Sequence, residues 1–400
     1  MPEALIVDAV RIPRAKANAD TGIYAKCKPV DLLKPLYKAL CERNHLDSNN
    51  VQDVLLGCST QSGEQGSNLA KISTLHAGWS DQVSGATINR FCCSGLDAVN
   101  IVASKVIAGM ESLAVAGGIE HLSRVPMFSD KGPWFSDPEV MKTSRFMHMG
   151  VSADLIAVQQ GYSKEQLDIV ACESHKRAAN AIDKGYFDRS LVPVRESNGS
   201  PLLLNDNNVR RDFALKTLAK LPPSFTDFVP MAQKLIDKFY PGTALEAVHS
   251  AGSSPALVDG ASLVMIANQK TCERLGLQPR ATVRHFANAS CEPVKMLDGH
   301  IKATESVLKA TGIRTKDIDL WEVNESFAST VLLYQKHFGI DAKRLNVNGG
   351  AIALGHPLGA TGGILIGTLL DELERRDLKR GVVAICGGAG VGVATLIERT

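Results

Sequence analysis

The chain has 400 residues, 44% of them hydrophobic, so it can bury a large core as two domains or as one repeated architecture. Its 44 lysines and arginines against 42 aspartates and glutamates leave a net charge of +2, which gives no overall field for nucleic acid or a membrane surface. The first residues lack a basic segment followed by an apolar core, and the apolar runs elsewhere are too short to span a bilayer. We therefore expect a cytoplasmic protein that binds neither nucleic acid nor membranes.

The cysteines indicate reduced thiols. There are nine, an odd number, in a long chain without a secretion signal. No Cys-x-x-Cys pair occurs, which argues against a zinc site or a redox motif. The sequence therefore predicts no metal site.

The first 120 residues predict alternating strands and helices. Strands are expected at residues 5–7, 51–58, 86–88 and 112–118, and helices at residues 31–41, 68–77 and 96–107. The run from Val54 to Leu56 is apolar at every position, as in a parallel sheet that is covered on both faces. This part therefore reads as the beginning of an α/β unit.

Residues 251–400 repeat that order, with helices at 303–310 and 364–375 and strands at 318–323 and 382–385. Three pairs of landmarks are separated by nearly equal numbers of residues: Cys58 and Asn324, Cys92 and His356, and Gly117 and Gly387. We infer an internal duplication into two α/β halves, although regular α/β alternation alone can produce similar registers. Ligands of such sheets bind beyond the carboxyl ends of the strands.

Residues 121–250 read as an insertion between the halves, with clustered methionines and a polar, basic stretch at 202–220. One long helix is expected at 165–184, where it returns to the N-terminal half, and Gly185 is expected to cap it. The basic side chains in the polar stretch either hold an anion or form a solvated face, and the residues alone favour neither reading: Arg210, Arg211, Lys216 and Lys220.

Cys92 and Cys93 lie where the strand at 86–88 ends and an apolar-periodic helix begins. Free backbone amides and the helix dipole favour an anion there, so a thiol at this place is expected to ionise more easily and to attack as a nucleophile. The alternative is that these cysteines are small apolar residues packed beneath the helix. One cysteine by itself does not decide between the two.

Four separate stretches carry a family resemblance. They are Cys92-Cys93-Ser94-Gly95-Leu96, Asn324-Glu325-Ser326-Phe327-Ala328, Gly355-His356-Pro357 and Cys386-Gly387-Gly388. In this order they resemble the cysteine box, the Asn-Glu-Ala-Phe box, the Gly-His-Pro box and the Cys-Gly-Gly box of the thiolase family. They are spread over nearly the whole chain.

The resemblance implies a duplicated five-layer α-β-α-β-α fold with residues 1–120 and 251–400 as the two halves and residues 121–250 as an inserted coenzyme A-binding loop region. It implies that Cys92 attacks the acyl carbon and holds the acyl group, and that His356 takes the proton of the Cys92 thiol. Cys386 would exchange a proton with the acetyl carbon. Asn324 would orient a water beside His356, and the backbone amides of Cys92 and Gly388 would form an oxyanion hole. Glu325 and Glu120 are expected to be structural.

The resemblance also implies contacts with coenzyme A. These fall on His148 and Met149 along the pantetheine channel, on Phe327 in its wall, on Ser250 and on the basic residues Arg210, Arg211 and Lys220. Two departures affect them: Ser326 replaces the usual alanine, and Pro255 stands in the place of a serine that commonly contacts coenzyme A.

The sequence as a whole therefore predicts a thiolase that transfers an acyl group between coenzyme A and a 3-ketoacyl-CoA. Formation of acetoacetyl-CoA from two acetyl-CoA molecules uses the same residues and is the first alternative. A decarboxylating condensing enzyme or a non-catalytic acyl-CoA or lipid carrier of the same fold is the second. Coenzyme A is expected as substrate, with no bound cofactor, and the family resemblance implies a homodimer or homotetramer.

Overall fold

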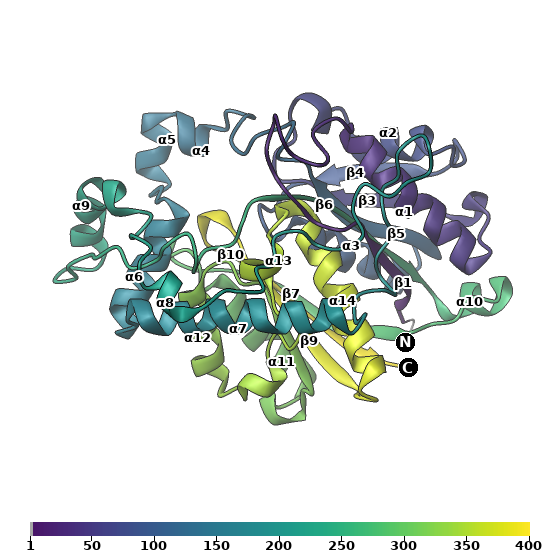
Figure 1. The fold of residues 1–400 in the computed structure, drawn as a ribbon. Helices are drawn as coiled ribbons and strands as arrows, with labels where there is room; N and C mark the ends of the chain where they lie inside the picture. Colours follow the sequence, from purple (N-terminus) through teal and green to yellow (C-terminus); the bar gives the residue numbers. More distant parts are fainter. Residues whose placement is uncertain (1–2) are drawn as a thin grey trace.

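The computed structural model describes residues 3–400 (Figure 1). Its strands are β1 (Leu5–Arg11), β2 (Ala15–Lys16), β3 (Asp53–Gly57), β4 (Ser84–Ile88), β5 (Leu113–Glu120), β6 (Val258–Ala267), β7 (Ala281–Ser290), β8 (Leu320–Val323), β9 (Arg380–Cys386) and β10 (Val391–Arg399). Its α-helices are α1 (Pro29–Asn44), α2 (Leu69–His76), α3 (Ser94–Ile107), α4 (Pro133–Ser136), α5 (Pro138–Thr143), α6 (Met149–Gln160), α7 (Lys164–Asp183), α8 (Leu215–Leu218), α9 (Val229–Phe239), α10 (Gln269–Leu275), α11 (Gly299–Thr311), α12 (Ala328–Phe338), α13 (Ala351–Leu354) and α14 (Thr361–Arg375). The strands and helices expected from periodicity are all present, with ends that differ by a few residues.

The strands form one sheet path in the order β4-β3-β5-β6-β1-β7-β10-β9-β8, and β2 pairs with β6. The two parts of the sheet have the same strand directions. In the first part, β3 runs parallel to β5, and β6 lies antiparallel to both β5 and β1. In the second part, β8 runs parallel to β9, and β10 lies antiparallel to both β9 and β7. Within residues 3–400, the strand pairing between the two parts consists of two residue pairs, which β1 forms with β7. The internal duplication is therefore confirmed.

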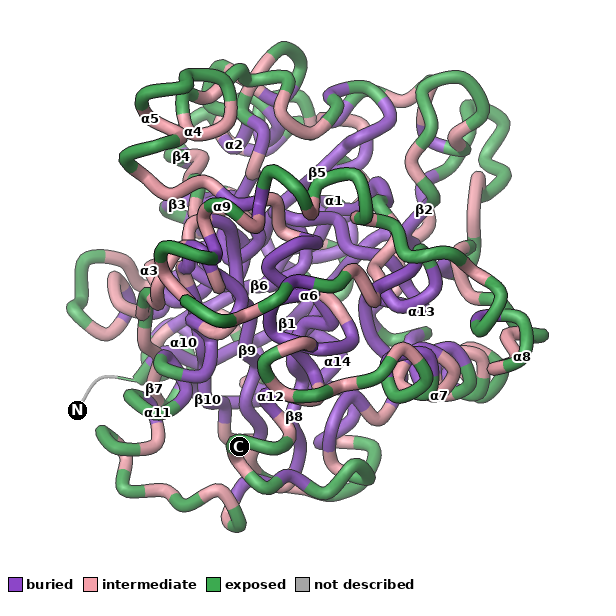
Figure 2. Tube along the Cα trace, turned by 90° about the vertical axis from the view of Figure 1, so that its left-hand side faces the viewer, coloured by how far each residue is buried: buried purple, intermediate pink, exposed green. Residues whose placement is uncertain are grey.

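The helices form layers around these two sheet halves. α3 and α14 pack against each other between them, and the core cluster that surrounds this pair is buried from both sides. α1 and α2 cover the outer face of the first half, whereas α11 and α12 cover the second (Figure 1). The buried trace in the middle of the molecule follows this arrangement, with exposed chain on the outside (Figure 2). This is the predicted five-layer architecture.

The contact between α3 and α14 depends on glycine. A β-carbon added at Gly362 would overlap the backbone nitrogen of Leu96, and one added at Gly95 would overlap the carbonyl oxygen of Gly359. Only residues without a side chain permit backbones to approach this closely. The central layer therefore brings the chain before α3 and the chain before α14 side by side.

The region between the halves differs from expectation in one respect. α7 itself packs against α12 and α13 of the second half, and it is the chain after it that reaches the first half, where Leu191 bridges to Arg11. The reason is its apolar stripe, because Leu167 and Ala171 are covered by Ala328 and Ile352. Gly185, which follows the C-cap residue Lys184, has φ +68°, as its capping role requires. The expected boundary at residue 250 is also wrong. β6 lies after it, in the part expected to form the second half, but completes the first half of the sheet.

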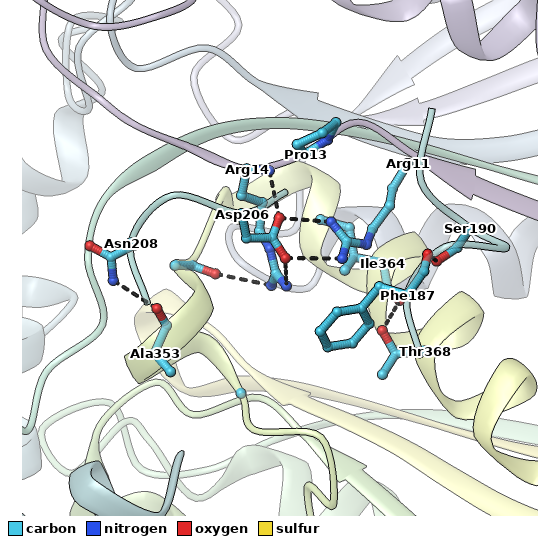
Figure 3. Close-up of polar contacts among 12 residues, drawn as sticks. Arg11, Pro13, Arg14, Phe187, Ser190, Asp206, Asn208, Ala353, Ile364 and Thr368 are labelled. Carbon is cyan, nitrogen blue, oxygen red and sulfur yellow. Dashed lines mark hydrogen bonds and ion pairs between the residues drawn. The ribbon is translucent and has the colours of Figure 1, made fainter. Parts of the chain in front are cut away.

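A buried ion cluster ties the segment around Asp206 to the chain that follows β1 (Figure 3). The carboxylate of Asp206 accepts hydrogen bonds from Arg11 Nη1 at 2.8 Å and Nη2 at 3.0 Å, and from Arg14 Nη2 at 3.0 Å. Arg14 Nη1 also donates to the carbonyl of Gly355 at 3.3 Å. Burial alone would raise the pKa of Asp206, but the two guanidinium groups hold it well below its usual range.

Replacing Asp206 by alanine would leave two buried guanidinium groups without their counter-charge. We expect Asp206→Ala to reduce the free energy of unfolding by about 3–5 kcal/mol, measured by chemical denaturation followed by circular dichroism. Asp183→Ala is the matched control, since Asp183 and its partner Arg211 are both more than half exposed, and it should lower the free energy of unfolding far less than Asp206→Ala. Equal losses in the two variants would contradict this reading.

Candidate active site

Cys92 lies in a tight connection between β4 and α3. Phe91 has φ +50°, a left-handed conformation that is costly for a bulky side chain. The turn is held by its neighbours: Phe91 N donates to Asn89 Oδ1 at 2.7 Å, and the hydroxyl of Ser94 donates to the carbonyl of Phe91 at 2.6 Å. These contacts present Cys92 at the start of the central helix.

The electrostatic surroundings of Cys92 differ from the expectation. The residue is 8% exposed, and burial raises its pKa to about 12, with Cys386 and Glu120 adding to the effect. The prediction of an easily ionised thiol is therefore wrong for the free protein, because desolvation of a buried thiolate outweighs the favourable field at the start of α3. The resting group is a neutral thiol.

His356 is a neutral imidazole in the same environment. Its Nδ1 shares a hydrogen bond of 2.8 Å with Thr361 Oγ1, while its Nε2 is buried without a hydrogen-bond partner among residues 3–400. Burial lowers its pKa to about 4, with the charge of Arg14 contributing. An uncharged ring held at Nδ1 leaves Nε2 for accepting a proton. Thr361 was not predicted from the sequence, although it lies only five residues after His356.

Cys386 ends β9 and faces a small polar group. Its thiol donates to Ser326 Oγ at 3.2 Å, and Asn324 Nδ2 donates to the same oxygen at 2.9 Å. Burial raises the pKa of Cys386 to about 12, whereas the hydrogen bond with Ser326 opposes that rise. Asn324 Oδ1 has no partner in the described part of the chain. The amide of Asn324 is thus engaged with Ser326, and its expected role toward a water stays a prediction.

These side chains meet in one cavity of about 200 Å³. Cys92, His356 and Cys386 line it, and so do three residues predicted to contact coenzyme A: His148, Met149 and Phe327. A second cavity of about 40 Å³ touches Cys92 and is walled by aromatic side chains that include Phe91 and Trp134. Two thiols and an imidazole, all uncharged and buried together, form a site that can move protons and carry an acyl group on sulfur.

Comparison with known proteins agrees with this geometry. Residues 4–228 match the family model described as the thiolase N-terminal domain, and residues 277–399 match the thiolase C-terminal domain. The chain belongs to the thiolase family. It is 36% identical over 409 aligned residues to a 3-ketoacyl-CoA thiolase of Aliivibrio fischeri, and 36% identical over 407 to one of a Marinomonas species. The first alignment covers 100% of both chains; the second covers 99% of this chain and 98% of the relative.

Solved structures show the same relationship. The crystal structure of the Bacillus anthracis acetyl-CoA acetyltransferase superposes with a TM-score of 0.87 at 30% identity, covering 100% of this chain and 99% of that one. The thiolase resemblance and the five-layer thiolase fold are confirmed.

The Cys-Gly-Gly box of this thiolase-family chain places Gly388 beside Cys92, on the wall of the smaller cavity. A β-carbon at Gly388 would lie 3.0 Å from the ring of Trp134 and 3.1 Å from that of Phe91. Ala389 follows with φ +55°, which turns the chain sharply before β10. The position is compatible with a backbone donor close to Cys92, and the oxyanion role stays a prediction.

Two carboxylates of the thiolase-family chain form the structural contacts expected of them. Glu120 is fully buried and accepts hydrogen bonds from the backbone of Ser59 at 2.9 Å and of Gly359 at 3.0 Å. Glu325 accepts from Ser174 Oγ at 2.6 Å and from the backbone of Ile352 at 3.1 Å. Both carboxylates therefore fix loops of the site.

The predicted coenzyme A contacts fall into two groups. His148 accepts from the backbone of Gly150 at 3.2 Å and stacks on Phe228 with ring centroids 4.5 Å apart, beside the larger cavity. Ser250, by contrast, is fully buried, and its hydroxyl accepts from the backbone of Gly252. The basic side chains are exposed and do not line the cavity: Arg210, Arg211, which pairs with Asp183, and Lys220.

Residues 3–400 contain no group of three or more side chains suited to hold a metal ion. Within the same range no helix is both long and apolar enough to cross a bilayer.

Proposed function

We propose that this thiolase-family chain cleaves a 3-ketoacyl-CoA with coenzyme A to give acetyl-CoA and a shortened acyl-CoA, in a reversible reaction. The observation that carries the proposal is that Cys92, His356 and Cys386 line the same cavity. The names of the full-length relatives support it. Coenzyme A enters as a substrate, and the chemistry below uses only side chains and backbone of this chain.

In the first half-reaction, Cys92 gives its proton to His356 Nε2 as its sulfur attacks the ketone carbon of the substrate. The tetrahedral oxyanion then collapses, which breaks the carbon–carbon bond and leaves the acyl group on Cys92 as a thioester. The departing acetyl-CoA enolate takes its proton from Cys386. His356 is then an imidazolium and Cys386 a thiolate, so the net charge of the site is unchanged.

In the second half-reaction, coenzyme A gives its thiol proton to the Cys386 thiolate and attacks the thioester. When this intermediate collapses, the Cys92 sulfur leaves and recovers its proton from His356. Backbone amides of Cys92 and Gly388 would stabilise the thioester oxyanion. All groups therefore begin and end neutral, and between the two half-reactions the imidazolium of His356 and the thiolate of Cys386 balance each other.

The alternatives differ in their support. Condensation of two acetyl-CoA molecules is the same sequence in reverse, and the solved relative bears the name of that activity. The small cavity beside Cys92, of about 40 Å³, favours a short acyl remainder while Trp134 stays in place. A decarboxylating enzyme of this fold is disfavoured because such enzymes generally use one cysteine with two histidines, or with a histidine and an asparagine, whereas the cavity of this chain holds a second cysteine, Cys386.

The purified chain should consume acetoacetyl-CoA and a longer 3-ketoacyl-CoA in the presence of coenzyme A, followed as loss of the ketoacyl absorbance. Cys92→Ala should lower kcat on the order of a thousandfold or more, because the thioester can no longer form. Cys172→Ala is the control: this half-buried thiol lies on α7 away from the cavity and should leave the rate unchanged. Turnover of acetoacetyl-CoA alone indicates the short-chain enzyme, and no turnover by the folded protein contradicts the proposal.

We also propose that two copies pair through β4. This strand is an edge of the sheet and is half-buried to exposed, and the neighbouring α2 exposes Ile72 by 48% and Leu75 by 46%. An unpaired strand beside apolar side chains is a template for pairing with another chain.

Light scattering on the purified chain should therefore give at least the mass of a dimer. The double substitution Ile72→Glu and Leu75→Glu should shift it toward the monomer, because it places charges in the contact. Leu204→Glu, at a residue that is 61% exposed elsewhere, should have no effect. A wild-type chain that is monomeric at all concentrations would refute the pairing.

A further inference from the structure

Ser326 occupies the one position of the Asn-Glu-Ala-Phe box where this chain departs from the family pattern. It lies between β8 and α12, is 6% exposed and lines the larger cavity. Its hydroxyl oxygen is the meeting point of two donors, the thiol of Cys386 at 3.2 Å and Asn324 Nδ2 at 2.9 Å. Alanine at this position would make neither contact.

The hydrogen-bonding capacity of a hydroxyl makes this arrangement reversible. The oxygen has two lone pairs and one hydrogen that rotates. Asn324 is a permanent donor through its amide, so it holds one lone pair in every protonation state. When Cys386 is a thiol, it donates to the second lone pair. When Cys386 has lost its proton, the serine hydrogen can turn and donate to the sulfur.

We propose that Ser326 is a further catalytic residue, whose hydroxyl accepts from the Cys386 thiol and donates to the Cys386 thiolate as the proton leaves and returns. The inference deepens the proposed function, since it concerns the same proton transfer. No additional atom is gained or lost: the serine keeps its proton and only changes the direction of its O–H bond.

Burial strengthens the hydrogen bond between Ser326 and Cys386. Asn324 and Cys386 are each 1% exposed, so water contributes little to solvating a thiolate at this place. A hydrogen bond to a charged group in such surroundings is stronger than one between neutral groups. The same hydrogen bond opposes the rise of the Cys386 pKa that burial causes.

The direct test is the alkylation rate of Cys386, measured by peptide mass spectrometry in a Cys92→Ser background so that the other reactive sulfur is absent. At fixed pH between about 8 and 9.5, Ser326→Ala should slow alkylation about tenfold, as expected from losing a hydrogen bond to the thiolate. Ser326→Thr keeps the hydroxyl and should restore most of the rate. Ser329→Ala is the control, because this buried serine donates to the carbonyl of Ala153 and not to Cys386.

Turnover provides the second readout, in the chain with Cys92 intact. Ser326→Ala should lower kcat about tenfold with little change in KM, and Ser326→Thr should recover it. An unchanged alkylation rate in Ser326→Ala, or Ser326→Thr as impaired as Ser326→Ala, would overturn the inference. Because alkylation needs no acyl-CoA substrate, a chain without turnover but with the alkylation difference would refute the proposed function and leave the role of Ser326 standing.

Discussion

The close approach of α3 and α14 is the constraint on which the site depends. The two helices come from different halves of the duplicated fold, and their backbones meet at Gly95, Gly359 and Gly362, where no β-carbon fits. Cys92 precedes one of these helices and His356 precedes the other. The glycines therefore serve catalysis indirectly, because they bring a nucleophile and a base from opposite halves to one cavity.

Buried ionic groups hold the loop that carries His356 at both ends. Arg14 donates to the carbonyl of Gly355 on one side, and Glu120 accepts from the backbone of Gly359 on the other. The imidazole between them is fixed through Thr361. The same packing removes water, which keeps Cys92 and Cys386 as thiols and His356 uncharged in the free protein. In the proposed reaction, charges therefore form on these side chains only after the substrate has bound.

Much of this was predictable because local signals agree with the fold. Periodicity predicts the strands and helices of both halves, and the four boxes point to Cys92, His356 and Cys386, which line one cavity. What could not be predicted depends on contacts remote in sequence: α7 packs on the second half, β6 completes the first, and Thr361 supports His356. The easy ionisation expected of Cys92 is wrong because the sequence shows its helix start but not the depth of its burial.

The measurement that tests this account most directly is the pH dependence of Cys92 alkylation by a small reagent in the free protein. With a Cys92 pKa of about 12, the rate should be low at neutral pH and keep rising past pH 9. His356→Asn should change it little, because the neutral imidazole has taken no proton. A plateau near neutral pH that His356→Asn abolishes would reveal a preformed thiolate–imidazolium pair and contradict the account.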